Sequence, residues 1–144
     1  MTLDEIHKLW EIDSVIDKTK LVDESLRKPL LHYKYYKILI DETLILKKME
    51  SKFKTLKLEK TEFYSDGPTK ETQEKGWKYP SKGIILKKDV PLYVESDSDI
   101  IELNLKTDLQ QEKVDYLISI IKTVSDRDWT IKNAVEVLKF NAGS

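Results

Sequence analysis

The sequence lacks cysteine altogether, so disulfide bonds, thiolate zinc sites and cysteine nucleophiles are excluded. Histidine occurs only at His7 and His32, and two isolated imidazoles do not make a metal cluster. No glycine-rich phosphate-binding fingerprint is present, so neither a nucleoside triphosphate site nor a dinucleotide site is indicated. We therefore expect no cofactor and no bound metal.

Long apolar runs are missing as well. The longest strongly apolar run, residues 116–121, is far too short to cross a bilayer, so no membrane contact is expected. The first residues show neither the basic region nor the apolar region of a signal peptide. Together with the absence of cysteine, these features predict a soluble protein of a reducing compartment.

What the sequence does contain is dominated by helical patterns. Thr2 and Glu5 have the spacing of a capping box, which predicts a short first helix. A long helix is predicted over about residues 20–64, in which Pro29 either introduces a kink or begins a fresh segment. Beyond Pro29 one helix face recurs every three or four positions and is apolar except at Glu42 and Lys60, as in an amphipathic helix: Leu39, Leu46, Met49, Phe53, Leu56 and Phe63. So long a helix is expected to bury its remaining apolar face against another subunit.

The rest of the chain predicts shorter elements. Residues 65–83, rich in glycine, proline and polar residues, are expected to form a loop. Residues 84–86 and 92–94 are interpreted as short strands or a hairpin, and residues 100–103 as a third short element or a helical turn. Helices over residues 109–126 and 129–140, with Asp128 as the N-cap of the second, predict an αα-hairpin. The expected fold class is therefore mainly α: a long amphipathic helix and a C-terminal αα-hairpin, with a loop or short β-hairpin inserted between them.

Charge is distributed unevenly along the chain. Residues 27–60 carry 10 basic and 4 acidic side chains, a net charge of +6, whereas residues 1–26 and 92–144 each have a net charge of −4. A basic strip can neutralise phosphates with release of counterions, which favours nucleic-acid binding. A lysine-rich helix face that is merely solvated is the alternative, because lysine is an ordinary helix former.

Aromatic residues alternate with lysines over residues 33–37 and again over residues 75–82. This pattern suits the binding of single strands, whose unpaired bases can stack on aromatic rings. Trp77 and Tyr79 lie among Lys75, Lys78 and Lys82. These two aromatic side chains either stack on bases or pack onto the body of the protein. Tyr35, Tyr36 and Phe63 are interpreted as core residues rather than as stacking platforms.

Glu95, Asp97 and Asp99 form the acidic cluster that most resembles a catalytic site. Carboxylates could hold a divalent cation, as in a metal-dependent nuclease. A solvated turn or helix start is the favoured interpretation, and since no companion acidic motif stands out, an enzyme is not expected.

Three segments, in the same order, resemble the UvsY family of recombination mediators: residues 16–21 (IDKTKL), 62–67 (EFYSDG), and a tail with 131–134 (IKNA) and 140–143 (FNAG). The family places strand-binding basic residues in a Lys-x-Arg-Leu sequence just before the second segment. Here that stretch reads KLEKT over residues 57–61. Lys60 matches the family's arginine, Leu58 replaces its lysine, and Lys57 is displaced by one position.

The resemblance implies a protein without catalysis that binds single-stranded DNA, weakens the coat of the phage single-strand-binding protein and helps load a RecA-like recombinase of the UvsX type. It also implies a ring-shaped homo-oligomer of about six or seven subunits in the cytoplasm of the infected bacterium. From charge and resemblance together we assign a strand-binding lobe to residues 1–91 and an oligomerisation lobe to residues 92–144. The predicted strand-binding residues are Lys54, Lys57, Lys60, Lys75, Trp77 and Lys78. The predicted oligomerisation residues are Val114, Leu117, Ile118, Ile121, Val135 and Leu138. A coiled-coil adaptor without DNA binding is the alternative.

Overall fold

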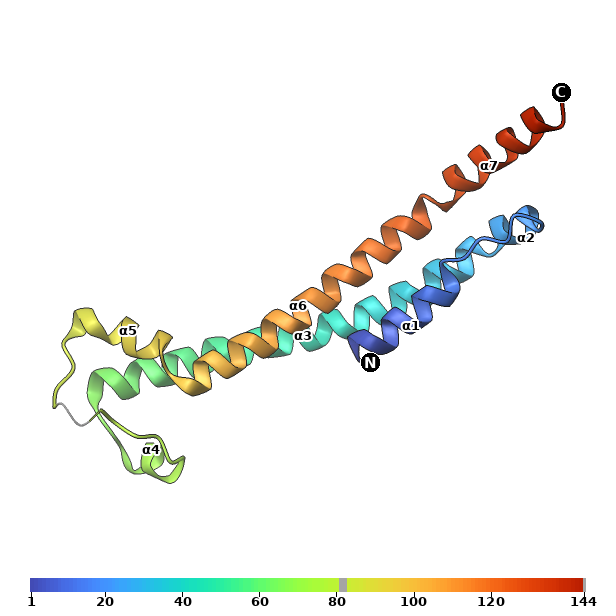
Figure 1. Cartoon of the computed structure of the whole chain (residues 1–144). Coiled ribbons are helices and arrows are strands. Elements are labelled where there is room, and N and C mark those ends of the chain that lie inside the picture. Colours follow the sequence, from blue (N-terminus) through green and yellow to red (C-terminus); the bar gives the residue numbers. More distant parts are fainter. Residues whose placement is uncertain (81–82, 144) are drawn as a thin grey trace. The chain divides into compact units, whose positions relative to one another are not determined.

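A computed structural model describes residues 1–80 and 83–143, and within them every regular element is a helix (Figure 1). The predicted mainly α fold is confirmed. The elements are α1 (Leu3–Asp13), α2 (Leu21–Leu26), α3 (Lys28–Asp66), α4 (Lys70–Glu74), a 3₁₀ turn (Lys87–Asp89), α5 (Val90–Glu95), α6 (Ser98–Ser125) and α7 (Arg127–Asn141).

The helix starts follow from local chemistry. At α1 the Thr2 hydroxyl accepts a hydrogen bond from the Glu5 N–H at 3.1 Å, while the Glu5 carboxylate accepts one from the Thr2 N–H at 2.8 Å, which confirms the capping box. Pro29 is the second residue of α3. Proline fits the first turn because no helical partner exists there for its missing N–H. Of the two alternatives for Pro29, the beginning of a fresh segment is correct.

The prediction of a C-terminal αα-hairpin was wrong. Only Asp126 separates α6 from α7, and its backbone is itself helical, with φ −83° and ψ −1°. Its N–H donates to the Lys122 carbonyl at 3.0 Å, and its own carbonyl accepts from the Thr130 N–H at 3.2 Å. The chain therefore bends slightly but does not reverse, and α7 continues in the general direction of α6 (Figure 1). Asp128 is not an N-cap: it lies inside α7 and pairs with Lys28 at 2.7 Å.

The middle of the chain also differs from the prediction. Inside the expected loop, Thr69 and Thr72 form the capping box of α4. The proposed strand at residues 92–94 lies within α5, and no strand is found in the described parts of the chain. Val90 and Val94, four residues apart, are the buried side chains of α5, so the apolar pattern has the helical period rather than the alternating one.

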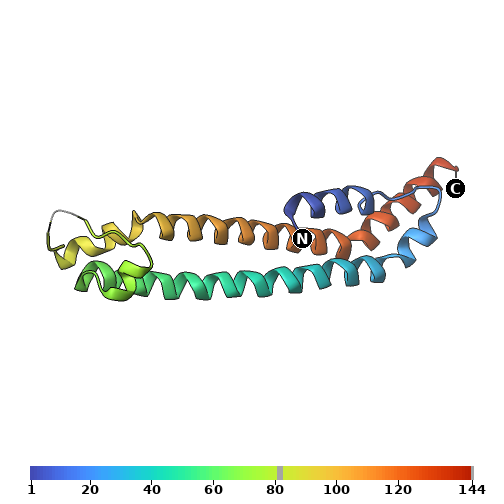
Figure 2. The same cartoon turned by 90° about the horizontal axis from the view of Figure 1, so that it is seen from below.

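The chain divides into two compact units. The first comprises Met1–Leu44 and Gln111–Ser144, and the second comprises Ile45–Gln110. The core of the first unit is formed by α1, α3 and α6, with Ile6, Leu31, Tyr35, Leu117, Ile120 and Val124 almost fully buried. Figure 2 shows α1 lying alongside the later part of α6, where the rings of His7 and Tyr116 are 4.4 Å apart.

The second unit has its own core, which is richer in aromatic side chains. Phe63 and Tyr64 at the end of α3 are buried with Ile85, Val90, Val94 and Ile100. Trp77 and Tyr79 pack against this cluster from the segment that follows α4. The assignment of strand binding and oligomerisation to residues 1–91 and 92–144 concerns what each part does, and it remains a prediction.

Candidate nucleic-acid interface

The second unit exposes a set of lysines on α3: Lys47, Lys48, Lys52, Lys54 and Lys57. Each is exposed to solvent, and none forms an ion pair with any residue that the structure describes. The predicted strand-binding residues Lys54 and Lys57 belong to this set. Their ammonium groups are available to an external anion.

Helical spacing sorts these lysines into rows. Lys48, Lys52 and Glu59 follow one another by four and seven residues, so they lie on one side of α3. The ammonium of Lys75, which follows α4, lies 3.6 Å from the Glu59 carboxylate. Lys75 therefore extends the row that Lys48 and Lys52 begin, and we call these three residues the lysine row. Lys78 is also exposed, a few residues further along the chain.

Lys60 lies in a different environment from the other predicted strand-binding residues. Its side chain is only 3% exposed, and its Nζ lies 3.1 Å from Asp97 Oδ2 and 2.9 Å from Asp99 Oδ2. The same ammonium sits 3.8 Å from the centroid of the Trp77 ring. The position that matches the family's arginine is thus occupied by a buried, fully partnered cation.

Asp97 explains the acidic cluster. Its Oδ1 accepts hydrogen bonds from the N–H groups of Asp99 and Ile100 at the start of α6, and its Oδ2 accepts from the Tyr64 hydroxyl at 2.6 Å. Burial by itself raises the pKa of Asp97, but the hydrogen bonds from Tyr64 and Lys60 outweigh it and hold this pKa below its usual range. The interpretation as a helix start is confirmed, although Asp97 is buried rather than solvated.

The same contacts weigh against the nuclease alternative. Both oxygens of Asp97 are engaged by protein donors, and the Asp99 carboxylate is neutralised by Lys60. Within residues 1–80 and 83–143, no three or more histidine, aspartate or glutamate side chains are grouped as a metal site requires.

Of the two alternatives for Trp77 and Tyr79, packing onto the body is what the structure shows. Phe63 is the centre of this packing, since its ring meets the rings of Trp77 and Tyr79 edge to face at 5.5 and 5.6 Å. The Tyr79 hydroxyl also donates to the Tyr64 carbonyl at 3.3 Å. Tyr35 and Phe63 are core residues as predicted, but Tyr36 is 48% exposed because the next position on a helix points about 100° away from Tyr35.

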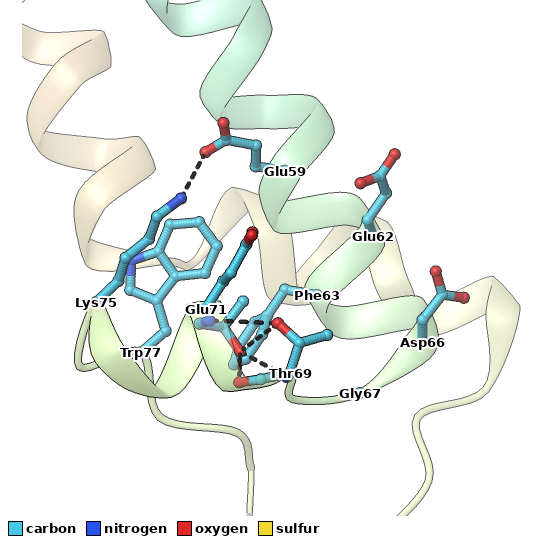
Figure 3. Close-up of a pocket in the computed structure, with 10 residues that line it drawn as sticks. Glu59, Glu62, Phe63, Asp66, Gly67, Thr69, Glu71, Lys75 and Trp77 are labelled. Carbon is cyan, nitrogen blue, oxygen red and sulfur yellow. Dashed lines mark hydrogen bonds and ion pairs between the residues drawn. The ribbon is translucent and has the colours of Figure 1, made fainter.

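A cavity of about 220 Å³ opens beside Trp77 (Figure 3). Figure 3 shows Lys75 reaching toward Glu59 along the indole ring, while Glu62 and Asp66 point outward from α3. Phe63 and Trp77 supply the aromatic lining, and the charged lining consists of Glu59, Glu62, Asp66, Glu71 and Lys75. Four carboxylates against one ammonium repel a phosphate backbone. The cavity is therefore a poor place for a nucleic-acid strand, although Lys75, which belongs to the lysine row, is one of its lining residues.

The first unit contains a buried polar network that the sequence did not reveal. Asp13 accepts hydrogen bonds from the Tyr35 hydroxyl at 2.7 Å and from the Lys34 ammonium at 2.6 Å, and it pairs with Arg27 at 3.1 Å. Burial alone raises the pKa of Asp13, but the bonds from Lys34 and Tyr35 bring it below the usual value. Burial and the neighbouring Asp13 carboxylate raise the pKa of Tyr35.

The predicted oligomerisation residues fall into three groups. Val114 and Leu117 are buried in the core of the first unit. Ile121 and Val135 are half-buried, whereas Ile118 and Leu138 are exposed. Further apolar side chains on α7 are exposed as well, with Trp129 at 65% and Phe140 at 79%. The helix α7 thus presents several large apolar side chains to solvent, and their role in oligomerisation stays a prediction.

No helix in the described part of the chain is both long enough and apolar enough for a bilayer crossing. The fold is similar to that of an all-helical recombination mediator. Over 99% of this chain and 98% of the other, it superposes with a TM-score of 0.83 and 18% identity on a crystal structure of the bacteriophage T4 recombination mediator protein UvsY, lattice type II. The lattice type IV crystal gives a TM-score of 0.78 at 16% identity, covering 98% of this chain and 99% of the other.

A family model described as "Recombination, repair and ssDNA binding protein UvsY" matches residues 9–144. The chain belongs to the UvsY family, as the resemblance predicted. A search of curated protein sequences finds no match.

Proposed function

We propose that this protein binds single-stranded DNA through the exposed lysines of its second unit. The observation that carries the proposal is the group of unpaired lysines on α3, joined by Lys75 through its contact with Glu59. Lys47, Lys54, Lys57 and Lys78 complete the proposed surface. The family match supports the choice of ligand, since the family is described as binding single-stranded DNA.

Binding of this kind is governed by phosphates. Each lysine that meets a phosphate releases a condensed counterion, so affinity falls as salt rises, with a slope of about −0.7 per contact for single strands. No sequence preference is expected, because lysine ammonium groups read charge and not base edges. The strand would follow α3 and avoid the acidic cavity beside Trp77.

The wider role follows the family. We propose a mediator without catalysis, acting in the cytoplasm of an infected bacterium. It would hold a strand that carries a coat of phage single-strand-binding protein, weaken that coat and help a RecA-like recombinase of the UvsX type to assemble. A ring of about six or seven subunits would repeat the lysine surface and raise the effective concentration of each further contact.

The test is charge reversal within the lysine row. Lys48→Glu combined with Lys52→Glu should weaken binding of a labelled oligothymidylate and flatten the salt slope. A matched control is Lys18→Glu with Lys20→Glu, which makes the same change in net charge at exposed positions of the first unit. Equal losses in both pairs would show that only overall charge matters. A wild-type protein that fails to bind at low salt would favour the coiled-coil adaptor.

A further inference from the structure

Lys60 connects three segments of the second unit. Its ammonium pairs with Asp97, the residue before α6, and with Asp99 in the first turn of α6. It also lies over the indole of Trp77, in the segment after α4, at 3.8 Å from the ring centroid. A lysine ammonium has three N–H donors, so two carboxylates and one aromatic face leave no donor for another ligand.

Trp77 in turn contacts other residues of the second unit. Its ring lies 5.5 Å from that of Phe63, and its backbone N–H donates to the Thr72 carbonyl at 3.1 Å. The ammonium of Lys75 lies 5.0 Å from the centroid of the same indole. The buried cation of Lys60 and the exposed cation of Lys75 are therefore linked through one aromatic ring.

We propose that Lys60 does not touch the strand and is instead a positioning residue of the strand-binding surface, holding Trp77 and through it Lys75 at the end of the lysine row. This inference rests on the proposed function. A phosphate could reach Lys60 only if the ammonium left both carboxylates, and stripping a buried carboxylate of its cation is strongly unfavourable. The free lysines on α3 offer phosphates the same charge without that penalty.

A double-mutant cycle tests the proposal. Lys60→Met should weaken oligothymidylate binding about tenfold in the wild-type background, but it should have almost no further effect once Trp77→Ala has removed the ring through which it acts. Lys57→Met is the matched control, because Lys57 is an exposed lysine of the same helix. It should weaken binding by the same factor in both backgrounds. A Lys60→Met effect that is equally large in both backgrounds would show direct phosphate contact and overturn the proposal.

Asp99→Asn provides a milder variant if Lys60→Met disturbs folding, since the Asp99 side chain is 49% exposed. If Lys60 met a phosphate, removing the competing carboxylate would tighten binding more than the control Glu102→Gln does, and the proposal would fail. A positioning role predicts that Asp99→Asn gives no such gain. Lys60→Arg keeps a cation over the indole, so it should retain more affinity than Lys60→Met does.

A readout without DNA separates this proposal from the proposed function. In a protein carrying Trp10→Phe and Trp129→Phe, Trp77 is the remaining tryptophan. Lys60→Met should then make the Trp77 indole more accessible to acrylamide, so quenching of its fluorescence should increase, whereas Lys60→Arg should not have this effect. Unchanged quenching in Lys60→Met would overturn the link between Lys60 and Trp77 even if strand binding is normal. Absence of strand binding by the wild type would instead overturn the proposed function, with the quenching result still valid.

Discussion

Arg127 in α7 and Glu24 in α2, 103 positions apart in the sequence, form a buried ion pair. Glu24 also lies 3.5 Å from Arg27, which pairs with Asp13. A chain of alternating charges thus joins α7 to α2 and α1. Because α7 begins at Arg127, this pair fixes the helix that carries Trp129 and Phe140 at its starting point.

Removing one member of this pair should be severely destabilising. Arg127→Met leaves the Glu24 carboxylate buried without its main partner, and we expect the free energy of unfolding to fall by about 3–5 kcal/mol. Urea denaturation at one fixed protein concentration measures it, since assembly also contributes to stability. Glu24→Leu combined with Arg127→Met should recover much of the loss. A single variant as stable as the wild type would show that the pair contributes nothing.

Acid should weaken both units through Asp13 and Asp97. The pKa of each carboxyl is lower in the folded protein than its ordinary value, so the stability that each contributes is fully present above that value and is lost as pH falls through the folded pKa. The loss should therefore begin below about pH 4. Asp13→Asn should be less stable than the wild type at pH 7 and should lose less on acidification. Parallel stability curves for the two proteins between pH 5 and pH 2 would contradict this account.

On α6 and α7, substitutions of exposed apolar residues should affect assembly, whereas substitutions of buried residues should affect stability. Ile118→Ser with Leu138→Ser changes two exposed side chains, so sedimentation should show smaller particles that keep their helical circular dichroism. Leu117→Ala, at a fully buried neighbour of Ile118, should instead lower the free energy of unfolding by about 2–5 kcal/mol. If the exposed pair leaves the particle mass unchanged, these residues do not contribute to assembly.

The sequence predicted those features that depend on short-range chemistry. The capping box of Thr2 and Glu5 and the helix start at Pro29 each involve only a few neighbouring residues. The strands expected near residue 93 failed because a run of apolar residues has no clear period when it is that short. The hairpin failed because Asp126 and Asp128 suggested a turn, whereas the backbone at Asp126 keeps helical angles.

At the candidate site, too, the sequence predicted what depends on nearby residues and missed what depends on distant ones. Exposure of Lys54 and Lys57 follows from their positions on an amphipathic helix, and their role in strand binding stays a prediction. The burial of Lys60 depends on Asp97 and Asp99, more than thirty residues away, and on Trp77. Helical periodicity did offer one signal, because Lys60 follows Phe53 and Leu56 by seven and four residues on the face that is turned inward.

Neutralising Glu59 should strengthen strand binding. Its carboxylate lies 3.6 Å from the Lys75 ammonium and occupies the same side of α3 as Lys48 and Lys52. Glu59→Gln removes a negative charge from the lysine row and frees Lys75, while the amide keeps the size of the side chain. Affinity for oligothymidylate at 50 mM salt should rise about threefold, and the gain should shrink as salt screens the charge. Glu11→Gln, at an exposed position of the first unit, is the control and should change affinity little. An equal gain from both variants would mean that net charge, and not the lysine row, sets the affinity.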